Sequence, residues 1–351
     1  MKARRAPSWE AESVSAPAAR LLTRPATSAD AEGPAFSDLL PDRWRDGDNR
    51  RSVVATDADG AVLGHCRGID NVFHPRSRTL VLEAREGAPW AEVADALVTA
   101  QIAVSTLPLH VKPSAHDAEL AALCARHGGV LVQLMPPWRY VVDQALRSWA
   151  REHRTTHDGL TAAGLDEVAV GLDADESALR EQMLDLYVEH YTAQHAAWSP
   201  AAAAERLRAE NAADFVPGGE GSFDPGRTRL LLRDGRIVAQ ALAWPAEPDG
   251  GTEITVQSRP HEGPTARKDM EACLATVVEC STDGDVLLID SHATEELESA
   301  MMREVPGPPP HPEDTWTAIV AIPVPDGPAP RPLPAQRIPE GAAPLVERLR
   351  G

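Results

Sequence analysis

The sequence predicts a mixed α/β protein with two tandem domains, each a mostly antiparallel central sheet flanked by helices. Three observations lead to this prediction. The chain has 351 residues, which is enough for about two domains. Two strand-like runs joined by an Asp-Gly turn occur twice, and the turns are 175 residues apart. Each pair is followed by a further strand and a helical pattern, so a domain-sized unit is repeated.

The first unit lies in the N-terminal third of the chain. Strand-like residues at 51–56 and 61–68 flank Asp59-Gly60, a pair that favours a tight hairpin turn. We expect a further strand at 79–83 and a helix from about 89 to 100. This order predicts a small sheet covered by at least one helix.

The second unit repeats that order. Strand-like residues at 228–233 and 236–243 flank Asp234-Gly235, and a strand is expected at 252–257. The helix expected at 266–280 has the clearest pattern, because its apolar residues recur at the spacing of one helical face. A helix over 176–191 is expected to open this unit, and a buried strand at 285–289 to follow it.

Proline-rich and irregular stretches set the expected boundaries. Residues 1–17 lack a sustained period and predict a flexible N-terminus. Residues 18–145 form the expected N-terminal domain and 146–325 the C-terminal domain. Residues 326–351 are a proline-rich tail, expected to be an extended strap or a mobile linker because proline fixes φ and lacks a donor.

Charge excludes two broad classes of partner. The chain has 53 Asp and Glu against 34 Lys and Arg, a net charge of -19. Nucleic-acid binding needs a basic face, so a nucleic-acid partner is not expected. Docking to an anionic membrane is disfavoured for the same reason. The scarcity of lysine beside abundant arginine, alanine and proline is typical of GC-rich bacterial coding sequence.

Cysteine usage and hydropathy indicate a cytoplasmic protein without a resident metal. Four cysteines occur and none forms a CxxC pair, which disfavours a disulfide scaffold or a zinc ribbon. No apolar run approaches the ~18 residues of a membrane-spanning helix, and no apolar stretch follows the basic N-terminus as in a signal peptide. His190 and His195 are not spaced as a helical zinc pair.

The order strand, hairpin, strand, helix, strand, helix, strand, found twice, resembles the GNAT acetyltransferase superfamily in tandem. The run Arg20–Asp30 looks like the first strand and helix start of that family, and Asp57–Gly64 looks like its second hairpin. The resemblance implies transfer of an acyl group from acetyl-CoA, or another acyl-CoA, to the amine of a small molecule or peptide. It places catalysis in the C-terminal domain, with the N-terminal domain degenerate.

The resemblance also implies a glycine-rich loop that holds the CoA pyrophosphate on backbone N–H groups and a helix N-terminus. In the second unit Gly263 matches one of the family's glycines, Thr265 stands where another is usual, and Glu262 replaces an arginine. The first unit's loop, Arg85 to Trp90, departs further from the pattern. The residues expected to bind the donor are Val256, Gln257, Ser258, Arg259, His261, Gly263, Thr265, Ala266, Arg267 and Lys268.

Candidate catalytic residues follow from the same resemblance. Acyl transfer to an amine needs a base that removes a proton. Glu253 lies on the strand where the family's bases are often found, and Asp290, Ser291 and His292 end the next strand. The helix expected after that strand contains no tyrosine to serve as the acid. Tyr187 and Tyr191 are expected to line the acceptor side, or else to be ordinary packing residues.

Two other interpretations remain open at this stage. Both phosphate loops depart from the family pattern, so the chain could be a catalytically silent protein that binds a ligand or a partner. Alternatively the fold could use a donor other than CoA, such as aminoacyl-tRNA, although the net charge of -19 counts against tRNA. The acceptor, the acyl group and the oligomeric state are not encoded in any recognisable motif.

Overall fold

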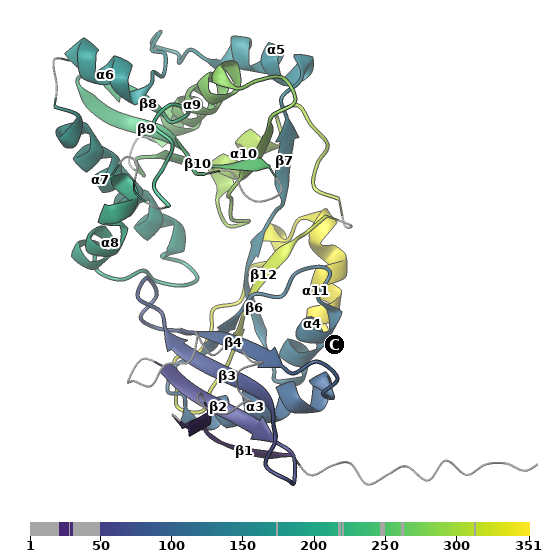
Figure 1. Ribbon diagram of the computed structural model, residues 1–351. Coiled ribbons are helices and arrows are strands. Elements are labelled where there is room, and N and C mark those ends of the chain that lie inside the picture. The colour runs from purple at the N-terminus through teal and green to yellow at the C-terminus, as the bar shows by residue number, and fades with distance from the viewer. Residues whose placement is uncertain are drawn as a thin grey trace, which may run out of the picture.

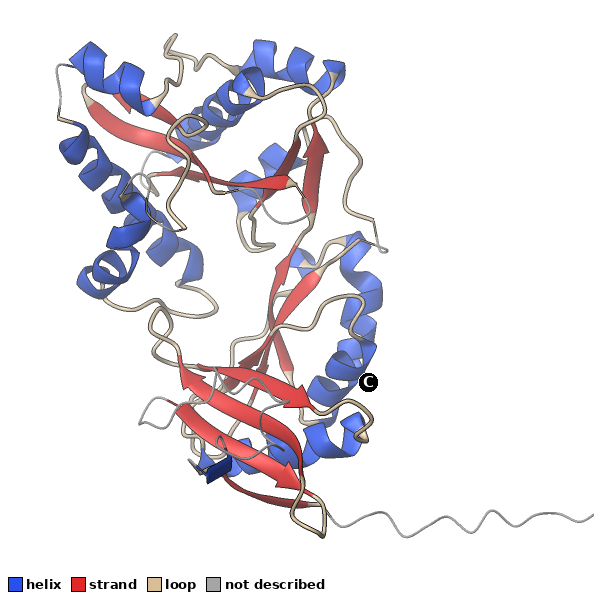
Figure 2. Cartoon of the chain, viewed as in Figure 1, coloured by secondary structure: helices blue, strands red, loops and turns tan. Residues whose placement is uncertain are grey.

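The computed structural model shows two lobes, each built on its own sheet (Figure 1). It describes residues 21–27, 29–30, 50–172, 175–216, 219, 221–245, 250–260, 263–311 and 314–351. The N-terminus expected to be flexible at residues 1–17 lies outside this range. The predicted fold class, mixed α/β with two sheets flanked by helices, is confirmed (Figure 2).

The N-terminal lobe is formed around a sheet with seven described strands in the order β1-β2-β3-β4-β5-β12-β6. Neighbouring strands are antiparallel except for β4 and β5, which are parallel. Helices α3, α4 and α11 bury their apolar faces with this sheet in one core. The bounds are β1 Leu22–Pro25, β2 Arg50–Thr56, β3 Val62–Asp70, β4 Arg78–Ala84, β5 Leu109–Val111, β6 Val130–Met135, β12 Thr317–Ile322, α3 Trp90–Val104, α4 Ala118–Arg126 and α11 Ala343–Arg350.

The C-terminal lobe has a sheet with five described strands in the order β7-β11-β10-β9-β8, of which only β10 and β11 are parallel neighbours. Helices α5 and α9 share a core with one face of the sheet, and α6, α7 and α8 share a core with the other face. The bounds are β7 Trp138–Val141, β8 Arg229–Arg233, β9 Arg236–Ala243, β10 Gly251–Ser258, β11 Val286–Ile289, α5 Gln144–His153, α6 Leu165–Leu172, α7 Glu176–His195, α8 Ala204–Asn211, α9 Ala266–Cys280 and α10 Glu296–Met302.

The two lobes exchange strands across the expected boundary at 145/146. Strand β7 precedes that boundary but pairs with β11 of the C-terminal sheet, while β12 inserts between β5 and β6 of the N-terminal sheet. Pro136 and Pro137 separate β6 from β7, and because proline lacks a backbone donor it interrupts strand pairing at this point. The division into 18–145 and 146–325 therefore remains a proposal about repeated units, and neither sheet is confined to one unit.

Several predicted elements are confirmed at their expected positions. The helix predicted over 266–280 is α9, Ala266–Cys280. The turn between β8 and β9 has φ of 51° at Asp234 and 75° at Gly235, as a type I′ hairpin turn requires. The proline-rich tail is only in part the expected extended strap. Leu333 N donates to Leu131 O at 2.8 Å, but Ala335–Arg337, Glu340–Ala342 and Ala343–Arg350 are helical, and the last of these, α11, packs on α4. Among the described residues, no helix has the length and hydropathy needed to span a bilayer.

Candidate functional site

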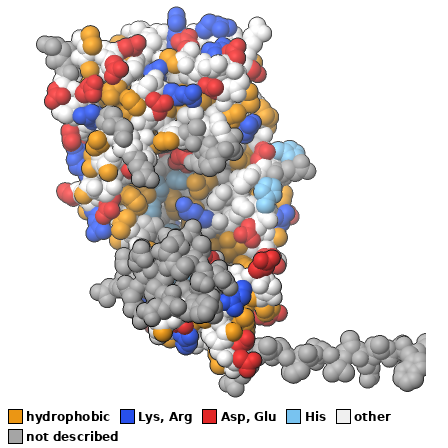
Figure 3. Space-filling view, in the orientation of Figure 1, with side chains coloured by type: hydrophobic (Ala, Val, Ile, Leu, Met, Phe, Trp, Pro, Cys, Tyr) orange, Lys and Arg blue, Asp and Glu red, His pale blue; other side chains and the backbone are white. Residues whose placement is uncertain are grey.

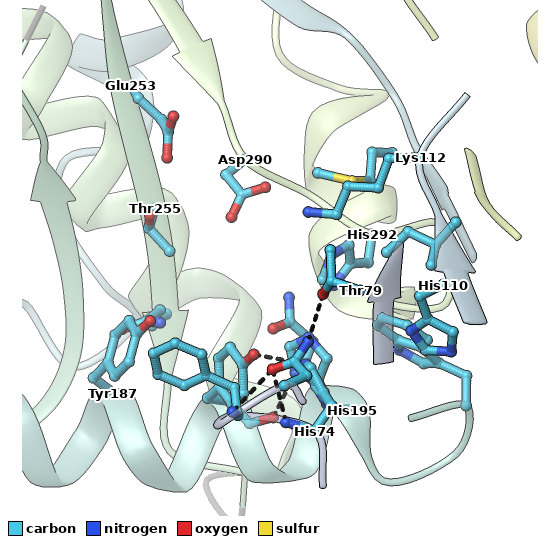
Figure 4. Close-up of a pocket in the computed structure, with 18 of the residues that line it drawn as sticks. His74, Thr79, His110, Lys112, Tyr187, His195, Glu253, Thr255, Asp290 and His292 are labelled. Atoms are coloured by element: carbon cyan, nitrogen blue, oxygen red, sulfur yellow. Dashed lines mark hydrogen bonds between the residues drawn. The ribbon is translucent and has the colours of Figure 1, made fainter. Parts of the chain in front are cut away.

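A cavity of about 340 Å³ lies between the lobes and is lined by both of them (Figures 3 and 4). Figure 3 shows histidine side chains deep in the hollow between the lobes. The C-terminal lobe contributes side chains from β10, α7 and the residues after β11. The N-terminal lobe contributes side chains from the loop before β4, from β4 itself and from β5. The size is that of a site for one small molecule.

Two carboxylates enter this cavity where β10 and β11 diverge. The strands pair over four positions, from Gly251 opposite Val286 to Ile254 opposite Ile289. Glu253 faces the cavity from β10, together with Thr255 and Gln257 at the two-residue period of a strand. Asp290 follows β11 directly, and its backbone N donates to Ile254 O at 3.2 Å. The divergence thus brings Glu253 and Asp290 to one wall, where a carboxylate can accept a proton from a bound amine.

Backbone groups of β10 also face the gap that forms where β10 and β11 diverge. The carbonyl of Glu253 faces β9, because it accepts from Trp244 N at 2.9 Å. The polar backbone groups of Val256 and Ser258 therefore face the opposite side, beyond the point where β11 has left. The N–H of Val256 is therefore directed into the gap between the two strands.

One helix supplies the aromatic wall of the cavity. Tyr187, Tyr191 and His195 recur every four residues along α7 and therefore share one face. His74, from the loop before β4, accepts from Tyr191 Oη at its Nε2 (2.8 Å), because its Nδ1 must donate to Ser199 O at 2.9 Å. His195 Nδ1 likewise donates to Tyr191 O at 2.8 Å. The two bonds of His74 link the N-terminal lobe to the C-terminal lobe along the cavity, whereas the His195 bond lies within α7.

Burial keeps three of the cavity histidines neutral. It lowers the pKa of His74 and of His110 to about 4, and that of His195 to about 2. The imidazoles then act as hydrogen-bonding groups rather than as cations at neutral pH. Lys112, which directly follows β5, is the one Lys or Arg among the described residues that line the cavity.

The structure distributes the four predicted catalytic residues over two hollows. Glu253, Asp290 and His292 line the central cavity, and Tyr187 and Tyr191 do so as well. Ser291 instead lines a neighbouring pocket of about 670 Å³ beside Pro136 and Trp138, and its side chain is buried. Glu253 and Asp290 line both hollows, so the two carboxylates lie at the partition between them.

The basic residues predicted to hold a pyrophosphate are already in ion pairs. Arg259 is buried, donating from Nε to Ile237 O at 2.9 Å and from Nη1 to Glu189 Oε1 at 2.6 Å. Arg267 and Lys268 both contact Glu271, at 2.8 Å and 2.5 Å. A phosphate group binding through these side chains must first compete with the carboxylates.

The other predicted donor-binding residues are arranged around β10 and the start of α9. Val256 is buried in the core shared with α9, and Gln257 accepts from Gln240 Nε2 at 2.8 Å. Gly263 has φ of +61° and open space at its Cα, and Thr265 makes no side-chain capping bond to α9, which begins at Ala266. His261 lies outside the described residues, and so does Glu262.

A buried triad that the sequence did not reveal lies beside this loop. His190 on α7 donates from Nδ1 to Ser258 O at 3.1 Å and lies 3.2 Å from Glu295 Oε1 through Nε2. Both ring nitrogens face acceptors, so the imidazole is charged. Burial by itself would lower the pKa of His190, but Glu295 and the Ser258 carbonyl raise it above its usual value.

The third member of the triad, Glu298, holds a proton. Burial opposes ionisation of both Glu295 and Glu298. Hydrogen bonds with Glu298 and His190 nevertheless lower the pKa of Glu295. Burial and the Glu295 charge raise the pKa of Glu298 well above its usual range. Glu298 is therefore a neutral acid that donates to ionised Glu295. Among the described residues, no group of three or more His, Cys, Asp or Glu side chains is arranged to hold a metal.

Comparisons with known proteins give structural similarity only. No family model and no curated protein sequence matches the chain. A GCN5-related N-acetyltransferase from Sphaerobacter thermophilus is 15% identical, with a TM-score of 0.49 over 87% of this chain and 97% of that one. A tandem GNAT protein from the clavulanic acid biosynthesis pathway is 12% identical, with a TM-score of 0.46 over 88% of this chain and 100% of that one. A GNAT-family acetyltransferase from Colwellia psychrerythraea is 11% identical, with a TM-score of 0.44 over 86% and 98%. Because each TM-score is below 0.5, these similarities do not decide what the chain does.

Proposed function

We propose that the chain is an acyl-CoA-dependent N-acyltransferase that transfers an acetyl or other acyl group to the amine of a small molecule or peptide. The observation that carries this proposal is the position of Glu253 and Asp290 at the divergence of β10 and β11, facing one cavity. The thioester would lie in the opening between the strands. The amine would occupy the cavity beside the two carboxylates.

The proposed reaction uses groups already in place. A carboxylate, Asp290 or Glu253, takes a proton from the bound ammonium, and the neutral amine attacks the thioester carbonyl. The N–H of Val256 faces the opening and would stabilise the oxyanion that forms. The C–S bond then breaks, and the CoA thiolate leaves and takes up a proton. Catalysis therefore belongs to the C-terminal lobe in this proposal.

Donor binding would depend on backbone more than on side chains. The loop before α9 and the N-terminus of α9 can offer N–H groups to a pyrophosphate, and the dipole of α9 favours an anion there. Arg267 and Lys268 would add charge only by exchanging Glu271 for phosphate.

Calorimetric titration with acetyl-CoA tests the proposal, with Gly263→Asp and Gly87→Asp as a matched pair. Both glycines have positive φ and open space, at +61° and +79°, and each lies in the loop of its own lobe. Aspartate tolerates that backbone region, so the variants should differ in the added charge and not in folding. We expect one equivalent to bind wild type and Gly87→Asp, and none to bind Gly263→Asp. Loss of binding only in Gly87→Asp would move the donor site to the N-terminal lobe.

A second candidate function is a catalytically silent protein that binds a ligand without acylating it. The observation that favours it is the pairing of Arg259, Arg267 and Lys268 with carboxylates, which leaves a pocket of about 260 Å³ lined by Glu295, Glu296 and Glu298 beside the loop. An absence of heat with acetyl-CoA and with longer acyl-CoAs would favour this candidate over the acyltransferase.

A further inference from the structure

The central cavity has two ends of opposite charge. Figure 4 shows Glu253, Thr255 and Tyr187 on one side and Lys112, His292 and His110 on the other, with Asp290 between them. The acidic side belongs to the C-terminal lobe. Lys112 and His110 come from β5 and the residue after it, in the N-terminal lobe. The cavity therefore presents an anionic end and a cationic end to one ligand.

The opposite charges of Lys112 and Asp290 are not joined in a salt bridge. Within the described part of the chain, the side chains of Lys112 and Asp290 have no ion-pair partner, and they do not pair with each other although both point into the cavity. Three histidines that line the cavity, His74, His110 and His195, are held neutral by burial. A plain amine would satisfy the carboxylates and leave Lys112 facing the ligand without a counter-charge.

A buried polar atom without a partner lies at the Lys112 end of the cavity. His292 is 7% exposed and lines the cavity, and its Nδ1 has no hydrogen-bond partner among the described residues. A buried polar group without a partner costs free energy unless a ligand or water completes it. Lys112 and His292 together offer a charge and a hydrogen-bonding ring, which suits a carboxylate.

We propose that the cavity binds a free amino acid, with its ammonium at Glu253 and Asp290 and its carboxylate at Lys112 and His292. The inference rests on the proposed function only in taking this cavity as the acceptor site. It names the acceptor class as a small zwitterion and excludes simple amines and polyamines as the preferred ligands. The N-terminal lobe then supplies selectivity, and the C-terminal lobe supplies the groups that act on the amine.

Binding without any acyl-CoA tests this inference. The melting temperature of the whole protein is measured with each of the common L-amino acids, and with β-alanine and 4-aminobutyrate. Each amino acid is compared with the amine that its decarboxylation would give, where such an amine exists. Phenylalanine is compared with phenethylamine, and 4-aminobutyrate with propylamine. A ligand that binds only the folded state raises the melting temperature. We expect at least one amino acid to do so, and its matched amine to bind at least tenfold more weakly.

Two variants of Lys112 separate charge from packing. Lys112 is exposed, so its replacement should leave the fold intact. Lys112→Met keeps the aliphatic length and removes the charge, whereas Lys112→Arg keeps the charge. We expect Lys112→Met to lose at least tenfold in affinity for the amino acid and to bind the matched amine as wild type does, and Lys112→Arg to retain most of the affinity.

The outcomes distinguish this inference from the proposed function. Equal binding of amino acid and matched amine, or an unchanged preference in Lys112→Met, would overturn it. So would the binding of acetyl-CoA by a protein that none of the amino acids stabilises, and in that case the acyltransferase proposal would stand. Conversely, amino-acid binding that depends on Lys112, together with no binding of any acyl-CoA, would support the inference and refute the acyltransferase proposal.

Discussion

The two parallel strand pairs of the molecule, β4/β5 and β10/β11, face the same cavity with different chemistry. The C-terminal pair places Glu253 and Asp290 there, and the N-terminal pair places Thr79, His110 and Lys112. The C-terminal pair runs together over four positions and the N-terminal pair over two. The two lobes therefore contribute different chemistry to the cavity: the C-terminal pair contributes two carboxylates, and the N-terminal pair contributes a cation and a neutral imidazole.

The helices that pack on the two strand pairs, α9 and α3, also differ in the charge of their buried polar residues. On α9 of the C-terminal lobe, Asp269 and Glu271 are almost fully buried and held by ion pairs, with Asp269 Oδ1 3.1 Å from Arg233 Nη2. On α3 of the N-terminal lobe the buried polar residue is the neutral Gln101, whose Nε2 donates to Arg51 O and Cys66 O. Helix α9 therefore buries charged side chains where α3 buries a neutral one.

The largest expected effect is that of removing the C-terminal tail, which completes the core of the N-terminal lobe. The N-terminal core includes Leu345, Val346 and Leu349 of α11, all buried. Removing residues 326–351 would expose this part of the core, at a cost of roughly 5 to 9 kcal/mol at about 1.5–3 kcal/mol for each side chain. That approaches the whole stability of a typical domain, so we expect the N-terminal lobe to become sensitive to limited proteolysis. A truncated chain with unchanged melting and proteolysis would show that the tail does not complete this lobe.

The next prediction compares substitutions of the buried polar residues on α9 and α3. Asp269→Ala removes the buried partner of Arg233, which keeps the exposed Asp158 at 3.0 Å, and should lower the free energy of unfolding by about 3 kcal/mol. Gln101→Ala removes two hydrogen bonds and should lower it by about 1–3 kcal/mol. Urea denaturation of both variants measures the difference. A larger loss in Gln101→Ala would contradict the expectation that the buried charge on α9 matters more for stability than the buried amide on α3.

A sharper contrast is expected within the buried triad itself. Glu295→Gln removes the anion that stabilises charged His190 and should cost about 3 kcal/mol. Glu298→Gln replaces a group that is already neutral, so the free energy of unfolding at pH 7 should change by less than about 1 kcal/mol. Equal losses in the two variants would mean that Glu298 is ionised and that the proton has been placed on the wrong carboxyl.

The smallest expected effect is a slope in stability with pH. His74, His110 and His195 have pKa values in the folded state of about 4, 4 and 2, below about 6.5 for an unfolded histidine. The unfolded state therefore binds more protons below neutral pH, and each of these histidines should remove roughly 0.7 kcal/mol of stability between pH 7 and pH 6. His190 acts in the opposite sense, because its pKa is raised in the folded state.

Two variants test the sign of that slope. His74→Gln should make the stability less dependent on pH between 7 and 6, since one destabilising protonation is lost. His190→Gln should make it steeper, since the stabilising protonation is lost. Denaturant unfolding at both pH values measures each slope, and a change in the same direction in both variants would contradict the assigned charge states.

Local features of the fold could be predicted from the sequence because their causes lie close together in the chain. The apolar stripe of α9 and the Asp-Gly turns determine their own structures over a few residues. The exchange of β7 and β12 could not be predicted in this way, because β7 pairs with residues about 150 positions later and β12 with residues about 180 to 210 positions earlier. Helix α5 was missed although Asp143 caps it by accepting from Leu146 N, a signal present in the sequence.

The residues that the C-terminal lobe places in the cavity could be proposed from the sequence, and those of the N-terminal lobe could not. Glu253 and Asp290 could be proposed because each ends or lies on a strand of one repeated unit. Lys112 and His74 reach the cavity through the packing of one lobe against the other, which no local pattern encodes. The pairing of Arg259 with Glu189 also lay beyond prediction, because the partner is on α7, seventy residues earlier. The four-residue spacing of Tyr187, Tyr191 and His195 was the available signal for the aromatic wall.

The most direct test of the central claim, that chemistry belongs to the divergence of β10 and β11, is the rate of CoA release from acetyl-CoA in Asp290→Asn. Asp285→Asn is the matched control, because Asp285 precedes β11 as Asp290 follows it and instead caps Thr282 N and contacts Arg227. With the amino acid that binds best as acceptor, we expect kcat to fall by about 10²–10⁴-fold in Asp290→Asn and Glu253→Gln, and to stay near wild type in Asp285→Asn. An undiminished kcat in both Asp290→Asn and Glu253→Gln, together with a loss in His110→Gln, would place the chemistry in the N-terminal lobe.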